Sequence, residues 1–132
     1  MNVVDASVLV EYLAAGEHVE AAREAIGREP WVWAPALIDA EVGHALRRLV
    51  RGGEISARKA GDALDDLFEM RLQKVPHRHL VDRAWQLRDN VSFYDGLYVA
   101  LAEAAGSPLL TRDERLARVG GLRTEVELIG AG

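Results

Sequence analysis

Four acidic residues, far apart in the sequence, each stand at the end of an apolar segment or beside one. Asp5 follows the apolar run MNVV, and Asp113 comes just after the apolar run at residues 109–111. Asp95 begins a segment with helical spacing that is apolar nearly all round, so this acid is expected to border the interior. Glu41 lies on the flank of another helical apolar stripe. We expect the four carboxylates to converge at one site.

A cluster of four carboxylates favours a divalent cation. Two carboxylates about 4 Å apart repel by about 4 kcal/mol at an effective dielectric of about 20, so four would raise one another's pKa values unless a cation lay between them. Oxygen ligands without histidine or cysteine select Mg²⁺ or Mn²⁺ over zinc. The acids therefore indicate phosphodiester hydrolysis in which a metal-activated water attacks phosphorus and no side chain acts as nucleophile.

Each acid also has a structural explanation that needs no chemistry. Asp5 can cap the helix that follows it, Asp95 can be the acidic arm of a capping box, and Asp113 can complement a helix dipole. Glu41 can be an ordinary surface residue. Their joint placement favours a site, because chance rarely puts an acid at every site-facing boundary of one chain.

Short apolar runs alternate with amphipathic segments along the chain. The runs predict strands at residues 1–5, 31–35, 73–76, 108–111 and 124–129. In the segments between these runs, the spacing of apolar residues and the capping residues predict helices. They are expected at residues 6–14, at residues 17–28, from Pro35 to Gly52-Gly53, after a Ser56 cap, around residues 80–87, from a capping box at Ser92–Asp95 to Gly106, and after a capping-box pattern at Thr111–Glu114.

Strands that alternate with helices indicate a mostly parallel sheet covered on both faces. We therefore predict an α/β fold, a three-layer α/β/α sandwich. Residues 1–132 are expected to form a single domain, because no repeat, low-complexity stretch or linker divides them. In such sheets function gathers beyond the carboxyl ends of the strands. Asp5 and Asp113 emerge there together if their two strands are neighbours.

Composition is that of a soluble globular protein. Apolar residues make up 49% of the chain, cysteine is absent, and the formal net charge is -5. Without cysteine there are no disulfides and no thiolate metal site. The negative charge argues weakly against a nucleic-acid substrate, although an acidic metal site itself lowers the total. No signal peptide or membrane span is expected, so we expect a cytoplasmic protein without membrane association.

The chain resembles the PIN-domain ribonucleases, in particular the small VapC-type toxins of type II toxin–antitoxin systems. The resemblance covers the whole chain and rests on four segments in order: VVDAS at residues 3–7, PALIDAEV at residues 35–42, SFYDGLYVALA at residues 92–102 and LLTRD at residues 109–113. Any one of these segments is a weak match. All four in order, at this chain length, form a specific signal.

The resemblance implies an Mg²⁺- or Mn²⁺-dependent endoribonuclease that hydrolyses RNA phosphodiester bonds. It implies a catalytic and metal-binding set made of Asp5, Glu41, Asp95 and Asp113. It also implies an RNA substrate, a cognate antitoxin that blocks the site, and a homodimer. Some relatives have a further acid after the last aspartate, where Arg115 and Leu116 follow Glu114 in this chain. Whether one ion or two are held therefore stays open.

Three further residues are assigned supporting roles. Ser7 and Thr111 match the hydroxyl positions that accompany the acids in the family, where they would orient a carboxylate or a water. Helix capping is the alternative role for both. Arg112 stands between Thr111 and Asp113, so it borders the proposed site and is predicted to contact an RNA phosphate.

Other polar and aromatic residues are expected to have structural roles. The cluster Arg47, Arg48 and Arg51 can contact RNA phosphates, but a solvated face or a surface for an acidic partner is the favoured interpretation. His77 and His79 are expected in a solvated loop, and His44 on a helix surface. The tryptophans are expected as core or interface anchors and not as base-stacking platforms; they are Trp31, Trp33 and Trp85.

Two other phosphate-handling families are excluded. A phosphatase of the haloacid-dehalogenase type needs a second aspartate two residues after its nucleophile, and this chain has Ser7 there. A receiver domain needs a lysine near its acids, but Lys59 and Lys74 lie in the wrong segments. The remaining alternative is a catalytically inactive PIN-like protein-interaction module. The intact set of four acids argues against it.

Overall fold

A single parallel sheet runs through the centre of the molecule in the computed structural model, which describes residues 1–130. Its five strands are β1 (Asn2–Val4), β2 (Val32–Pro35), β3 (Leu72–Val75), β4 (Leu109–Thr111) and β5 (Val126–Leu128). They lie in the order β3-β2-β1-β4-β5, and every neighbouring pair is parallel. The predicted sheet is therefore confirmed, and it is wholly parallel.

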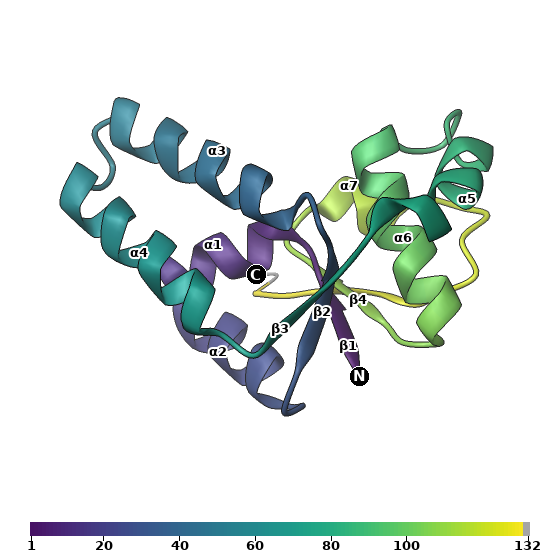
Figure 1. The fold of residues 1–132 in the computed structure, drawn as a ribbon, viewed down its shortest axis with the longest axis horizontal. Helices are drawn as coiled ribbons and strands as arrows, with labels where there is room; N and C mark the ends of the chain where they lie inside the picture. Colours follow the sequence, from purple (N-terminus) through teal and green to yellow (C-terminus); the bar gives the residue numbers. More distant parts are fainter. Residues whose placement is uncertain (131–132) are drawn as a thin grey trace.

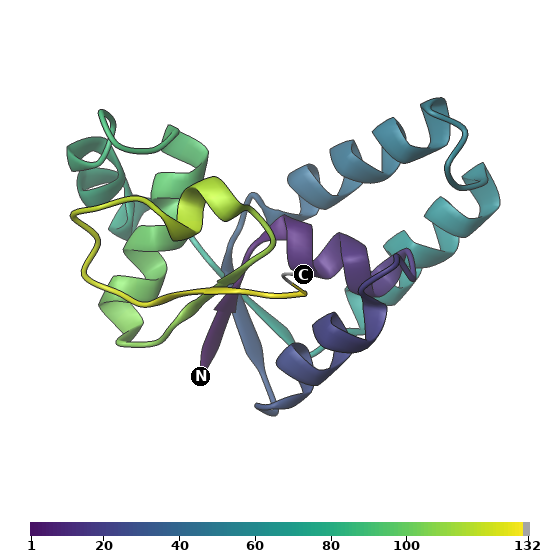
Figure 2. The same ribbon diagram turned by 180° about the vertical axis from the view of Figure 1, so that it is seen from behind.

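Helices cover both faces of this sheet, as predicted for a three-layer α/β/α sandwich. One side carries α1 (Ala6–Leu13), α2 (Val19–Gly27), α3 (Ile38–Arg51) and α4 (Ala57–Glu69). The other side carries a short 3₁₀ turn η1 (His77–His79), α5 (Val81–Gln86), α6 (Phe93–Ala105) and α7 (Glu114–Ala117). Figure 1 shows the two layers on either side of the strands, and the view from behind in Figure 2 agrees. In both views α3 and α4 extend side by side as an arm.

Burial explains why the central elements read as continuous apolar runs. Val3 and Val4 of β1 are completely buried, because helices cover both faces of a parallel sheet. Helix α6 packs against β1, β2 and β4, and residues 96–102 are all buried. The expectation that α6 lies in the interior, with Asp95 in its first turn, is confirmed.

The pairing of β1 with β4 creates the edge on which the site lies. Val4 aligns with Leu110, and the Asp5 N–H donates to the Leu110 carbonyl at 3.1 Å. After β1 the chain continues to β2 on one side of the sheet, whereas after β4 it continues to β5 on the other side. The carboxyl ends of β1 and β4 therefore form the topological switch point of the fold. The neighbouring placement expected for the Asp5 and Asp113 strands is confirmed.

Two predicted helix starts are wrong. Pro35 does not open a helix: it is the last residue of β2, opposite Val75, and α3 begins at Ile38. The missing proline N–H costs nothing there, because the next ladder bond is donated by Ala36 to the Val75 carbonyl. Thr111 does not cap α7, because it is still part of β4; Asp113 is the cap and accepts the Arg115 N–H at 2.9 Å.

The predictions for two aromatic types also need correction. His77 is not in a solvated loop: it lies in η1, and its Nε2 accepts the Leu37 N–H at 2.9 Å, which joins η1 to the start of α3. Trp31 and Trp85 are exposed, so neither is a core anchor, and an interface role for them stays a prediction; Trp33 packs partly buried against the core, as predicted. None of the helices within residues 1–130 is long and apolar enough to cross a membrane.

Candidate active site

Asp5 is the most enclosed of the four acids, with 8% of its surface exposed. It caps α1: its Oδ1 accepts the N–H groups of Ser7 at 3.0 Å and Val8 at 3.3 Å. Burial raises the pKa of Asp5 to about 6, although the hydrogen bonds it accepts oppose that rise. Asp95 adds a smaller electrostatic contribution that also raises the Asp5 pKa. A buried anion in this position favours a nearby cation.

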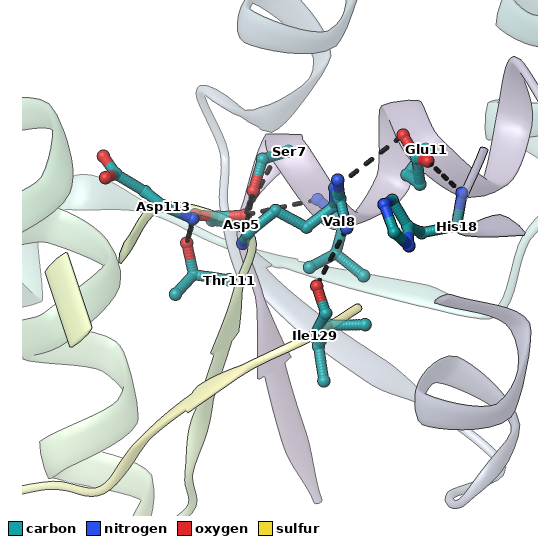
Figure 3. A network of polar contacts seen from close by, with 9 residues as sticks. Asp5, Ser7, Val8, Glu11, His18, Thr111, Asp113 and Ile129 are labelled. Atoms are coloured by element: carbon teal, nitrogen blue, oxygen red, sulfur yellow. Dashed lines mark hydrogen bonds and ion pairs between the residues drawn. The ribbon is translucent and has the colours of Figure 1, made fainter. Parts of the chain in front are cut away.

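Two hydroxyl groups hold Asp5 from opposite sides. Ser7 donates to its Oδ1 and Thr111 donates to its Oδ2 (Figure 3). Each hydroxyl also accepts a backbone N–H from the segment after β4: Arg112 N–H reaches Ser7 Oγ at 2.9 Å, and Asp113 N–H reaches Thr111 Oγ1 at 3.0 Å. Ser7 and Thr111 therefore lie where residues that orient the Asp5 carboxylate have to lie.

Asp95 interacts electrostatically with each of the other three acids. Its charge raises the pKa values of Asp5 and Glu41, and the charge of Asp113 raises its own. Burial is the largest cause of the raised pKa of Asp95, while the hydrogen bond with Ser92 opposes it. The expected Ser92 cap is confirmed by the Asp95 N–H, which donates to Ser92 Oγ at 3.0 Å.

Glu41 presents a buried oxygen without a partner. It is in the first turn of α3, and its Oε1 has no hydrogen-bond partner within residues 1–130. Burial raises the pKa of Glu41, and the Asp95 charge raises it further, against the effect of the neighbouring Tyr98 hydroxyl. The Tyr98 hydroxyl lies close enough to lower the Glu41 pKa but makes no well-directed hydrogen bond to Oε1. A buried carboxylate oxygen left in this state is costly unless a ligand meets it.

Asp113 lines a pocket together with Asp95, but its side chain turns away from Asp5. Its carboxylate points away from Asp5 in Figure 3 and accepts the N–H of Arg115, whose Nε lies 3.5 Å from the same oxygen. Among residues 1–130, no three acidic or histidine side chains are close enough, as placed, to hold one ion together. The four acids nevertheless offer only oxygen ligands, which are the type that Mg²⁺ and Mn²⁺ prefer. Among these oxygens, Glu41 Oε1 makes no hydrogen bond within the described residues and is available to a cation.

Comparison with known proteins decides the family. The family model described as "PIN domain" matches residues 3–122. Ribonuclease VapC1 of Mycobacterium tuberculosis is 48% identical over 128 residues, which span 96% of each chain. The chain belongs to the PIN domain family, among the VapC proteins. The resemblance inferred from the four sequence segments is thereby confirmed.

Solved structures agree on the fold. The Sarcin-Ricin loop cleaving toxin VapC20 of Mycobacterium tuberculosis superposes with a TM-score of 0.69 over 95% of this chain and 99% of its own, at 17% identity. A toxin–antitoxin complex from Klebsiella pneumoniae gives a TM-score of 0.63 over 96% of this chain and 100% of its own, also at 17% identity. At such identities the likeness concerns the PIN fold alone.

Tyr98 is a site residue of this PIN domain that sequence reasoning missed. Its Oη is buried beside the Glu41 carboxylate, without a well-directed hydrogen bond among the described residues, and close to the charges of Asp5 and Asp95. Burial and these charges raise the Tyr98 pKa, so the phenol stays neutral. The signal was its position three residues after Asp95, which puts both side chains on one helix face.

The guanidinium of Arg112 is engaged away from the acids. Its Nη1 donates to the Ile129 carbonyl at 2.9 Å, and its Nε lies 3.7 Å from Glu11 Oε2. Glu11 also accepts the His18 N–H at 2.6 Å, and Figure 3 shows this group beside the Asp5 cluster. Arg112 therefore connects the end of β5 to α1, while its backbone N–H supports Ser7. Its predicted phosphate contact would require the guanidinium to leave these partners.

Proposed function

We propose that this PIN domain is an Mg²⁺- or Mn²⁺-dependent endoribonuclease that hydrolyses RNA phosphodiester bonds, with Asp5, Glu41, Asp95 and Asp113 as its metal-binding residues. The observation that carries the proposal is geometric: Asp5 is buried at the carboxyl end of β1, is held by Thr111 of the neighbouring β4, and has Asp113 just beyond that strand. The charge of Asp95, at the start of α6, raises the pKa values of Asp5 and of Glu41 on α3. The name of the 48% identical relative, a ribonuclease, supports the RNA substrate.

Each side chain contributes a distinct part of the proposed chemistry. Asp5, fixed by Ser7 and Thr111, presents a carboxylate that cannot rotate freely. Glu41 presents Oε1, which makes no hydrogen bond within the described residues. Asp95 interacts electrostatically with the other three acids. When bound, a divalent cation supplies a water ionised near neutral pH and offsets charge on the phosphate. No side chain acts as the nucleophile.

The proposed partners follow from the same family. A cognate antitoxin is supported by the toxin–antitoxin complex from Klebsiella pneumoniae, whose fold this chain shares. Together with the ribonuclease names of its relatives, this supports a toxin role in a VapBC-type pair. A homodimer stays a prediction, to be checked by light scattering of the purified protein.

The test is cleavage of total RNA by the purified chain. We expect cleavage in Mg²⁺ or Mn²⁺, none after chelation, and none by Asp5→Asn, with a circular dichroism spectrum to show that this variant is folded. Equal cleavage in chelator would contradict the metal dependence. Equal cleavage by Asp5→Asn would contradict the assignment of the acids. A folded wild type that cuts no RNA under any of these conditions would favour a binding module instead.

A further inference from the structure

A groove of about 790 Å³ opens beside Glu41 and Ser7, between α1 and α3. Ser7 and Glu41 form part of its lining, so it is continuous with the proposed active site. Most of its wall is apolar and comes from the two helices: Ala6, Val10, Leu37, Ala40, Ala45 and Leu49. We refer to it as the α1–α3 groove.

Two cationic or hydrogen-bonding side chains follow Glu41 along the same wall. His44 and Arg48 come three and seven residues after it, a spacing that places all three on one face of α3, and all three line the groove. Both are exposed, and neither makes an ion pair or a side-chain hydrogen bond in the part of the chain that the structure describes. Their hydrogen-bond donors are available to an anionic ligand.

An aromatic ring lines the groove from the second face of the sheet. Tyr94, next to Asp95 at the start of α6, is 62% exposed and forms part of the groove lining. Burying so exposed a ring against a ligand is favourable, and a flat π-face accepts any nucleic-acid base. The groove lining thus combines an exposed aromatic ring, Tyr94, with Glu41 of the acid cluster and the guanidinium of Arg48.

We propose that the α1–α3 groove binds the single-stranded RNA segment next to the cleaved bond, with Tyr94 stacked on a base and His44 and Arg48 on backbone phosphates. The proposal deepens the ribonuclease function and rests on it. It also explains how a chain of net charge -5 holds a polyanion, because the cation in the groove, Arg48, lies next to the site and makes no ion pair in the described part of the chain. Seven residues of helix carry Arg48 about 10 Å beyond Glu41, past the phosphate being cleaved.

The test measures binding apart from cleavage. Fluorescence anisotropy with a labelled 12-nucleotide single-stranded RNA of mixed sequence, in EDTA, compares wild type with Arg48→Gln and with Tyr94→Ala. We expect Arg48→Gln to weaken binding about fivefold and to make the slope of log affinity against log salt shallower by about 0.7, the effect of one lost phosphate contact. Tyr94→Ala should weaken binding about tenfold, with the slope unchanged, and Tyr94→Phe should restore it.

Arg58→Gln is the matched control, since Arg58 is an exposed arginine on α4 that does not line the groove. Its affinity and salt slope should equal those of wild type. Undetectable RNA binding by wild type, or equal losses in Arg58→Gln and Arg48→Gln, would overturn the proposal. Unchanged RNA affinity in both groove variants, with lost inhibition by the antitoxin, would assign the groove to a protein partner and overturn it too.

Cleavage assays separate this inference from the proposed function. If wild type cuts RNA but the groove variants bind it normally, the groove inference fails and the ribonuclease stands. If the predicted binding losses appear but wild type cuts nothing, the ribonuclease assignment fails instead. In a cutting enzyme, Arg48→Gln should raise KM with little change in kcat, because the contact is made equally in the ground and transition states.

Discussion

Replacing Asp5 by asparagine should stabilise the metal-free protein at neutral pH while abolishing cleavage. Burial raises the pKa of Asp5 from 3.8 to about 6, even with the opposing hydrogen bonds from Ser7, Thr111 and Val8. That rise corresponds to about 3 kcal/mol of unfolding free energy lost when the carboxyl is ionised. Asparagine carries no charge, and its Oδ1 can still accept the N–H groups at the start of α1.

The direction in which folding shifts the Asp5 pKa sets how the stability of the protein changes with pH. The folded pKa of Asp5 lies above the unfolded one, so the folded state holds the proton more tightly. The stability that Asp5 contributes is fully present below about pH 4 and is lost as the pH rises through about 6. The advantage of Asp5→Asn over wild type should therefore be near zero at pH 4 and reach its full size by pH 8.

Thermal unfolding in EDTA between pH 4 and pH 8 measures this advantage. At pH 8 we expect Asp5→Asn to melt about 10 °C above wild type. Asp113→Asn is the control, because its side chain is 32% exposed and asparagine keeps the cap of α7; its advantage should be much smaller. A variant less stable than wild type at pH 8, or an advantage that does not vary with pH, would refute the reasoning.

Three further predictions concern hydrogen bonding, packing and metal. Thr111→Val removes the hydroxyl that donates to buried Asp5, so urea unfolding should show a loss of about 2 kcal/mol, which Thr111→Ser avoids; equal losses in both variants would argue against it. Gly96→Ala would put a Cβ 3.1 Å from Ala84 Cα and should cost about 2 kcal/mol, whereas Gly43→Ala, with nothing within 4 Å, should be neutral or stabilising. Saturating Mn²⁺ should raise the melting temperature of wild type but not of Asp5→Asn, and EDTA should reverse the gain; an equal rise in both would contradict a site at Asp5.

Local patterns were sufficient to predict the elements and their layers. Apolar runs such as Val3-Val4 and the apolar helix after Ser92 are signals carried by neighbouring residues, and both were located correctly. The alternation of strands and helices then predicted a parallel sheet. The error at Pro35 arose at a boundary, where proline suits the first turn of a helix and the end of a strand equally well.

Side-chain contacts between segments that are distant in the sequence could not be predicted from local patterns. The acids could be proposed as a group from their positions, but the rotation of Asp113 toward Arg115 depends on a cap that only the folded backbone defines. Arg112 looked free for phosphate because Glu11 and Ile129 are remote in the sequence, and no pattern links the three. Tyr98 was missed because its helix is apolar nearly all round, and no pattern along the sequence singles out one hydroxyl within it.

Calorimetric titration with Mn²⁺ tests most directly whether the four carboxylates form one divalent-cation site. Wild type and Asp95→Asn should be compared, because the Asp95 charge is coupled to those of the other three acids. We predict saturable Mn²⁺ uptake by wild type and at least about tenfold weaker binding by Asp95→Asn, a loss of about 1.4 kcal/mol or more. No uptake by folded wild type, or equal affinity in the two proteins, would contradict the account.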